Sequence, residues 1–246
     1  MRYWSVLSIL QYYSGRKHVY ATEGFTMLLS RLVYMLAPSA CLRCGAAGAE
    51  VCERCMDQVL QPKTPTCFRC NRLTRGFRTC RNCRRHTPLR RVWVAGYYEG
   101  IVTELISRMK YHNAIDNGRI GGQLLSAAIE GDWDLVVPVP SSPQRLRKRG
   151  FNPAYRIARS LARTQQRKCR SVLLRRDNRQ QVGSDRKQRL TQVQSAFTLR
   201  SPRLVEEKRV LLVDDVITTG ATLDACARCL HQGGARSVEA AVLARH

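Results

Sequence analysis

VLLVDDVITTGATL, residues 210–223, joins an apolar run, two adjacent carboxylates and a loop rich in threonine and glycine. The run over 209–213 is typical of a buried strand in a parallel sheet, and Asp214 and Asp215 follow it directly. The apolar spacing after the loop predicts a helix over 222–233. Because ligands bind at the carboxyl ends of parallel strands, the sequence predicts a binding site where this strand meets its helix.

The residues of this loop predict that the site takes a phosphate. Backbone N–H groups in such a loop and at a helix N-terminus attract anions, and Gly220 lets the backbone come close to one. Hydroxyl donors come from Thr218, Thr219 and Thr222. Two adjacent carboxylates would repel a bare phosphate, so we expect a ligand that also carries hydroxyl groups or Mg²⁺, as a phosphorylated ribose does. The competing interpretation is an ordinary strand, turn and helix with a threonine cap.

Apolar runs alternate with helical spacing along the rest of residues 92–246. Strands are predicted over 92–98, 135–140, 172–174 and 237–243, and helices over 101–111, 118–129 and 153–165. Residues 175–195 are polar, basic and poor in large apolar groups, which predicts a long mobile loop. The alternation is typical of an α/β domain with a mostly parallel sheet and helices on both faces, and we assign residues 92–246 to it.

Eight of the eleven cysteines form four C-x-x-C pairs between residues 41 and 83. Two such turns aim four sulfurs at one ion and leave zinc no open position, which predicts one or two structural Zn²⁺ ions. The two quartets are Cys41, Cys44, Cys52 and Cys55, and Cys67, Cys70, Cys80 and Cys83. The alternatives are free or disulfide-bonded cysteines and an iron–sulfur cluster. The spacing leaves open whether each quartet holds its own ion.

Residues 41–91 therefore form a predicted zinc-ribbon-like module with few large apolar side chains. Such a segment needs a metal to fold, and we expect metal removal to unfold it while residues 92–246 stay able to fold. Cys226 and Cys229 form a further C-x-x-C, but within the helix predicted over 222–233. There we interpret them as small buried residues.

The first forty residues form a predicted N-terminal tail with one helix. Residues 1–26 carry no motif, and we expect Met27 to be the true start. Leucines and a valine at helical spacing predict an amphipathic helix over 28–36, which docks on the protein itself or, alternatively, on a membrane surface. The sequence holds no run of about 18 uncharged apolar residues that could span a membrane. It shows no secretory signal, and we expect a cytoplasmic protein with reduced thiols.

The chain is strongly basic, with 42 Lys+Arg against 18 Asp+Glu and a net charge of +24. A charge of this size favours acidic partners such as nucleotides or nucleic acid. Between Pro143 and Leu190 there are 16 Lys+Arg and 2 Asp+Glu. This excess suits single-stranded nucleic acid held through its phosphates, and a solvated loop with a basic helix face is the alternative. No G-x-x-x-x-G-K-[ST] loop is present, which argues against an ATP-driven translocase.

Residues 210–223 resemble the signature of the type I phosphoribosyltransferases, and residues 41–246 as a whole resemble the ComF/GntX family. That family comprises phosphoribosyltransferase-like proteins with N-terminal cysteine motifs, linked to competence and to the use of external DNA. The residues that carry the resemblance are the cysteine quartets, Lys110-Tyr111, VPVPSSPQRLRKRGFNPA at 137–154, QQVGSDRKQRL at 180–190, Ala196-Phe197 and the threonine- and glycine-rich loop over 218–222, which we call the phosphate loop.

The resemblance implies a site for phosphoribosyl pyrophosphate (PRPP) with Mg²⁺, in which Asp214 and Asp215 bind the ribose hydroxyls. The residues that would hold the 5-phosphate are Thr218, Thr219, Gly220, Ala221 and Thr222. The loop after Val139 would face the pyrophosphate. The cations that would meet the pyrophosphate or lie in a flexible lid are Lys110, Arg145, Arg149, Arg186 and Arg189.

The sequence is compatible with two functions, one enzymatic and one non-catalytic. The first is a Mg²⁺- and PRPP-dependent transferase whose acceptor is not identified. The second is a non-catalytic accessory protein that binds single-stranded DNA through its basic surface, alongside protein partners of a DNA-uptake pathway. The phosphate loop supports the first and the charge distribution supports the second.

Overall fold

The computed structural model describes residues 40–59, 64–111, 115–176 and 196–246. The tail over 1–26, Met27, the helix predicted over 28–36 and the lid candidates Arg186 and Arg189 lie outside these residues. None of the described helices has the length and apolar composition that crossing a membrane requires.

A five-stranded, all-parallel sheet forms the centre of the described structure, in the spatial order β1-β7-β6-β2-β3. Its strands are β1 (Val92–Tyr97), β2 (Leu135–Pro138), β3 (Lys168–Cys169), β6 (Arg209–Ile217) and β7 (Ser237–Arg245). The central strands are nearly continuous runs of valine, leucine and alanine, because both faces of a parallel sheet are covered. The predicted parallel sheet is therefore confirmed.

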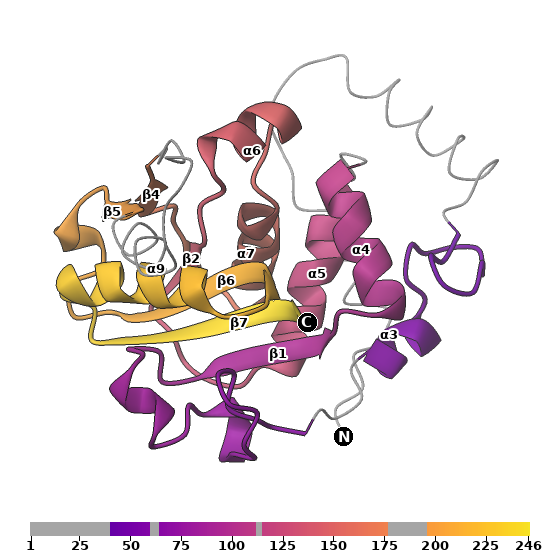
Figure 1. Cartoon of the computed structure of the whole chain (residues 1–246). Coiled ribbons are helices and arrows are strands. Elements are labelled where there is room, and N and C mark those ends of the chain that lie inside the picture. Colours follow the sequence, from indigo (N-terminus) through magenta and orange to yellow (C-terminus); the bar gives the residue numbers. More distant parts are fainter. Residues whose placement is uncertain (1–39, 60–63, 112–114, 177–195) are drawn as a thin grey trace, which may run out of the picture.

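Helices cover both faces of this sheet (Figure 1). Alternate side chains of a strand point to opposite faces, so Leu211 packs with α4 (Gly100–Tyr111), α5 (Ile115–Ala128) and α7 (Pro153–Thr164). Its neighbour Leu212 packs on the other face, with α9 (Ala221–Gln232). Two buried apolar clusters result, one on each side of the sheet.

The two cysteine-rich turns join different clusters. The first, over residues 41–59, ends in α3 (Glu53–Val59). Its Val51 and Val59 are buried in the cluster that contains α4. The second contains two short 3-10 helices, η1 (Arg75–Phe77) and η2 (Cys83–Arg85), and its Phe68 and Leu89 are buried in the cluster that contains α9. Residues 41–91 thus share their buried side chains with the sheet.

A helix that the sequence analysis missed follows β2. It is α6 (Pro143–Arg149), in the loop expected between the strand predicted over 135–140 and the helix predicted over 153–165. The Oγ of Ser142 accepts from the N–H of Arg145 at 3.3 Å, and Gly150 ends the helix in the left-handed conformation with φ of 75°. Ser-Pro at the start and Gly at the end are ordinary helix boundary signals, so the sequence did contain this helix.

One predicted strand boundary needs correction, and one predicted strand is confirmed in a separate sheet. The central strand does not stop at Val213, because β6 continues to Ile217, which pairs with Arg245 of β7. The short strand predicted over 172–174 is β4 (Leu173–Arg175), which pairs antiparallel with β5 (Phe197–Leu199) in a separate two-stranded sheet, followed by η3 (Pro202–Leu204). These two strands border the predicted basic loop, whose residues 177–195 lie outside the residues that the structure describes.

Candidate functional site

The acidic pair lies within β6, toward the carboxyl end of the sheet. Asp214 pairs with Val242 of β7 in the strand register, and both carboxylates are partly buried. Lys110, in the last turn of α4, places its Nζ 2.8 Å from Oδ2 of Asp215. Lys110 is one of the cations that the sequence predicted for this site, and the structure places it in direct contact with the acidic pair.

The electrostatics of the pair favour a ligand with positive charge or hydrogen-bond donors. Burial raises the pKa of Asp214 well above its ordinary value, and the adjacent charge of Asp215 raises it further. The backbone N–H of Asp215 donates to Oδ1 of Asp214 at 2.9 Å. This hydrogen bond lowers the pKa of Asp214, but by less than burial and the adjacent charge raise it. A strongly perturbed carboxyl at a strand end is typical of a functional site.

A small pocket of about 50 Å³ adjoins Asp214. Gly220, with φ of 78°, is the N-cap of α9 and adopts the left-handed conformation that favours glycine. The first N–H groups of the helix that follows have no acceptor within the helix and point toward its start. The pocket is lined by Asp214, Val216, Ile217, Thr218, Thr219, Gly220, Ala221, Thr222 and Leu223. Six of the seven residues predicted for ribose and phosphate thus line one pocket, and the seventh, Asp215, follows Asp214 directly in β6 but is not part of the lining.

The loop after β2 lies beside the acidic pair. The N–H of Val139 donates to the carbonyl of Val213, immediately before Asp214, at 2.9 Å. The side chain of Asn152 fixes this loop by donating to the carbonyl of Val139 at 2.9 Å. Helix α6 then carries Arg145, which is exposed and makes no ion pair among the described residues, and ends at Arg149.

The eight paired cysteines come together as two groups that could each hold a metal ion. Within each group, all sulfur atoms lie within 4.8 Å of one another. The groups are Cys41, Cys44, Cys52 and Cys55, and Cys67, Cys70, Cys80 and Cys83. The quartets therefore do not interleave, which the spacing had left open.

Backbone donors favour the thiolate, the form that binds metal, at one buried cysteine of each group, whereas burial raises the pKa of Cys55 and of Cys83 to about 12. Burial opposes ionisation of Cys41 and of Cys67, but backbone N–H groups outweigh it and lower the pKa of each to about 6. The cysteines of α9 differ, because burial raises the pKa of the Cys226 thiol well above its usual value. Cys226 is fully buried in α9, as predicted for a small core residue, whereas Cys229 is only partly buried, because it lies nearer the edge of the buried cluster.

Sequence reasoning missed the residues of the second cysteine group that contact the phosphate loop. Phe68, between Cys67 and Cys70, packs directly against Gly220. The next residue, Arg69, places Nη1 2.6 Å from Oδ2 of Asp224 in the first turn of α9. A large aromatic residue between two metal-binding cysteines was the available signal, because an exposed zinc turn has no need of one.

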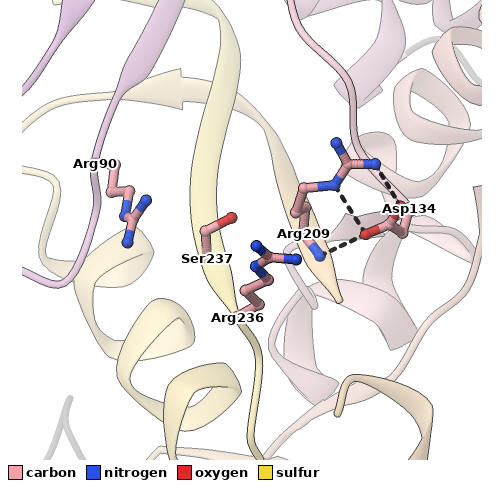
Figure 2. Close-up of a pocket in the computed structure, with 5 residues that line it drawn as sticks. All are labelled: Arg90, Asp134, Arg209, Arg236 and Ser237. Carbon is pink, nitrogen blue, oxygen red and sulfur yellow. Dashed lines mark hydrogen bonds and ion pairs between the residues drawn. The ribbon is translucent and has the colours of Figure 1, made fainter. Parts of the chain in front are cut away.

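A second, larger cavity of about 510 Å³ lies at the opposite, amino-terminal edge of the sheet (Figure 2). Arg209 is neutralised there, with Nη2 2.7 Å from Oδ1 of Asp134, and its hydrogen bonds lower the pKa of Asp134 to about 2. Ser237 also lines the cavity, and the guanidinium groups of Arg90 and Arg236 make no ion pair among the described residues. This cavity is a competing place for an anion, and a binding experiment needs to control for it.

The phosphoribosyl transferase domain model matches residues 112–246, more than half of the chain. The chain belongs to the phosphoribosyl transferase domain family. The matched residues include the loop after β2, the acidic pair and the phosphate loop, which are the parts of the site described above.

Three proteins with competence names are similar to this phosphoribosyl transferase domain protein. The chain is 36% identical over 112 residues to competence protein ComFC of Bacillus subtilis, covering 45% of this chain and 44% of that protein. It is 29% identical over 163 residues to competence protein F of Haemophilus influenzae, covering 62% and 71%. It is 27% identical over 150 residues to ComFC of Streptococcus pneumoniae, covering 60% and 65%. The chain thus spans less than half of the Bacillus relative.

Two solved structures show partial likeness to this phosphoribosyl transferase domain. Glutamine PRPP amidotransferase from B. subtilis, complexed with ADP and GMP, is 21% identical with a TM-score of 0.39, covering 51% of this chain and 25% of that one. Purine phosphoribosyltransferase from Pyrococcus horikoshii is 18% identical with a TM-score of 0.29, covering 58% and 75%.

Proposed function

We propose that this protein binds PRPP together with Mg²⁺ at the end of β6. The observation that carries the proposal is the partly buried pair Asp214 and Asp215 near the end of β6, two residues before a glycine-threonine loop that opens helix α9. Carboxylates accept hydrogen bonds from ribose hydroxyls, and the loop offers N–H and hydroxyl donors for the 5-phosphate.

Each part of the site has a distinct role in this proposal. Asp214 and Asp215 orient the ribose, while Lys110 places its ammonium group 2.8 Å from Oδ2 of Asp215. The loop over 139–142 faces the pyrophosphate, with Arg145 and Arg149 as the nearest predicted cations, and Arg186 and Arg189 belong to the predicted lid. Mg²⁺ fits this oxygen-rich site and would neutralise the pyrophosphate. Such positioning suits transfer of the phosphoribosyl group to an acceptor.

Calorimetric titration of PRPP with Mg²⁺ into the metal-loaded protein tests this proposal. We expect saturable binding that weakens at least about tenfold for each charged hydrogen bond removed, as in Asp214→Asn and Asp215→Asn. An Arg90→Ser/Arg236→Ser variant controls for the cavity at the opposite edge and should bind as the unmodified protein does. Binding that survives in the aspartate variants but disappears in this control would place PRPP elsewhere and overturn the proposal.

We also propose that each cysteine group holds one structural Zn²⁺. Four sulfurs within 4.8 Å of one another suit the tetrahedral thiolate site that zinc prefers, and leave no position for a substrate. Zinc bound by thiolates agrees with a reducing, cytoplasmic location. Elemental analysis should find two zinc ions per chain, falling to one in Cys44→Ser or in Cys70→Ser.

A second candidate function, binding of single-stranded DNA, is favoured by the exposed surface of α6 and α7. Arg159 and Arg163 project from α7 on the side opposite its buried Ile157 and Leu161, and Tyr155 is 38% exposed beside them. Phosphates would meet the arginines, and a base could stack on the tyrosine. The relatives' names, which refer to competence, agree with a role in the uptake or use of DNA.

The salt dependence of oligonucleotide binding tests this second function. The logarithm of the affinity for a single-stranded oligonucleotide should fall with the logarithm of salt concentration, by about 0.7 per neutralised phosphate. Arg159→Ser/Arg163→Ser should reduce that slope, whereas Arg90→Ser/Arg236→Ser, which removes the same charge elsewhere, should leave it unchanged. An affinity that does not depend on salt would contradict a phosphate-binding surface on α7.

A further inference from the structure

We infer that the second cysteine group, and not the first, is a positioning element for the phosphate loop. Its C-x-x-C turn reads Cys67-Phe68-Arg69-Cys70, and both residues between the cysteines contact the loop or its helix. The inference rests on the proposed function, because it assigns a role to this turn in binding at the same site. A metal held by this turn would therefore fix the ligand site as well as the module.

The first contact is between Phe68 and Gly220. Phe68 is 3% exposed, and a Cβ placed on Gly220 would lie 2.6 Å from Cε2 of its ring. The ring therefore lies flush against the backbone of the loop, where any side chain would collide with it. A residue packed this closely limits the conformations of the loop whose N–H groups face the proposed phosphate.

The second contact holds the start of α9. Arg69 Nη1 lies 2.6 Å from Oδ2 of Asp224, and Thr87 Oγ1 donates to the other oxygen of the same carboxylate. The side chain of Asp224 is only 13% exposed, which strengthens these charged hydrogen bonds. Because the N–H of Asp224 donates to the carbonyl of Gly220 at 2.9 Å, the turn is linked to the loop through the first helical turn.

The third contact ties the turn to the end of the sheet. Arg245 donates to the carbonyl of Phe68 at 2.9 Å and to Oγ1 of Thr66 at 3.1 Å. Arg245 pairs with Ile217 in the register of β7 and β6, and Ile217 is the last strand residue before the loop. The turn is thus anchored at the residue where the loop begins and at the helix where it ends.

The first cysteine group lacks this relation and supplies a matched control. Its turn, Cys41-Leu42-Arg43-Cys44, has an apolar residue and an arginine at the same two positions. Leu42 packs in the cluster that contains α4, and Arg43 donates to Gln58 of α3. Both contacts lie on the face of the sheet opposite Phe68, so removing them leaves the phosphate loop supported.

The test compares equivalent variants of the two turns. Phe68→Ala and Arg69→Gln should weaken Mg²⁺–PRPP binding on the order of tenfold and speed amide hydrogen exchange in residues 216–224. Leu42→Ala and Arg43→Gln should change neither, and Arg69→Lys should restore part of the affinity because it keeps a charge for Asp224. Zinc content, measured in each variant, should stay at the level of the unmodified protein.

The outcomes separate this inference from the proposed function. If the unmodified protein binds PRPP and both second-turn variants bind equally well with unchanged exchange, the inference is overturned. If the unmodified protein does not bind PRPP, the proposed function fails, but exchange in residues 216–224 of the ligand-free protein still decides the inference. If Phe68→Ala does not fold, Arg69→Gln, whose arginine side chain is 34% exposed, carries the test.

Discussion

At the scale of single residues, Asp214 combines a stability cost with the binding role proposed for it. Burial and the adjacent carboxylate of Asp215 raise its pKa, which makes its ionised form costly. An amide side chain at this position would avoid that cost, because it carries no charge. The proposed role of Asp214 in binding the ribose gives a reason for a carboxyl group at so costly a position.

Asp214→Asn should therefore raise the melting temperature at neutral pH while it weakens PRPP binding. A raised native pKa means that the native state keeps its proton longer than the unfolded chain. The unmodified protein then loses stability as pH rises from about 4 through the native pKa, and the variant escapes this loss. Each kcal/mol relieved should raise the melting temperature by about 2–4 °C.

Melting curves followed by circular dichroism from acidic to mildly alkaline pH check this prediction. The two proteins should melt alike at the acidic end and diverge as pH increases. Asp57→Asn, at an exposed position of α3, is the control and should show no such divergence. A variant that melts below the unmodified protein at every pH would show that Asp214 stabilises the fold.

Gly220 is fixed by both its conformation and its surroundings. Its φ of 78° disfavours any side chain, and a Cβ would meet the ring of Phe68 at 2.6 Å. Gly220→Ala should lower the free energy of unfolding by more than the roughly 1 kcal/mol of left-handed strain alone. Combining it with Phe68→Leu should recover part of the loss, measured by urea denaturation. Equal effects with and without Phe68→Leu would show that the contact adds nothing.

At the scale of elements, the packing of α5 on α7 depends on one close approach. A Cβ on Gly122 of α5 would lie 2.3 Å from Cβ of Ser160 and 2.6 Å from the backbone nitrogen of Leu161. Gly122→Leu must push the two helices apart and should cost about 1–3 kcal/mol or more. Gln123→Leu, one residue later on the exposed face, should cost little. Equal denaturation midpoints for the two variants would contradict this packing.

The sequence predicted most elements, because their apolar spacing is regular. The main strands and helices of residues 92–246 appear within a few residues of their expected bounds. Helix α6 was missed because its seven residues have no buried apolar side chain, so capping by Ser142 and Gly150 was the only signal. The extension of β6 through Asp214 and Asp215 was missed because pairing with β7, a tertiary contact, outweighs the local polarity.

Part of the site was predictable from the sequence, because most of its residues lie close together in the chain. Asp214 to Thr222 are contiguous in the chain, so a local motif contains nearly the whole phosphate pocket. Phe68 and Arg69 contact Gly220 and Asp224 from a segment more than 140 residues away, and no periodicity in the sequence links the two. Contacts of this kind become visible only when the fold is known.

At the scale of the whole molecule, the cysteine-rich segment does not pack as an independent body. It contributes Val51 and Val59 to one face of the sheet and Phe68 and Leu89 to the other. Sequence composition alone predicts that residues 92–246 survive metal removal. The shared clusters predict instead that stripping the metal exposes apolar surface on both faces of the sheet and weakens the entire fold.

Chelation of the proposed zinc should therefore destabilise residues 92–246 as well as residues 41–91. A structural zinc site contributes about 10–16 kcal/mol in small domains, which is comparable to the total stability of a typical protein. Hydrogen exchange read by mass spectrometry, with and without chelator, should show faster exchange in α4 and α9 in addition to the cysteine turns. Unchanged protection of α4 and α9 after complete zinc removal would contradict the shared core.

A crystal structure of the protein with PRPP and Mg²⁺ would locate the ligand. We expect the 5-phosphate within hydrogen-bond distance of the N–H groups of residues 218–222, and the ribose hydroxyls on Asp214 and Asp215. The ring of Phe68 should still pack against the backbone of Gly220 when the ligand is bound. A ligand bound instead between Arg90 and Arg236 at the opposite edge of the sheet, with the phosphate loop empty, would contradict this expectation.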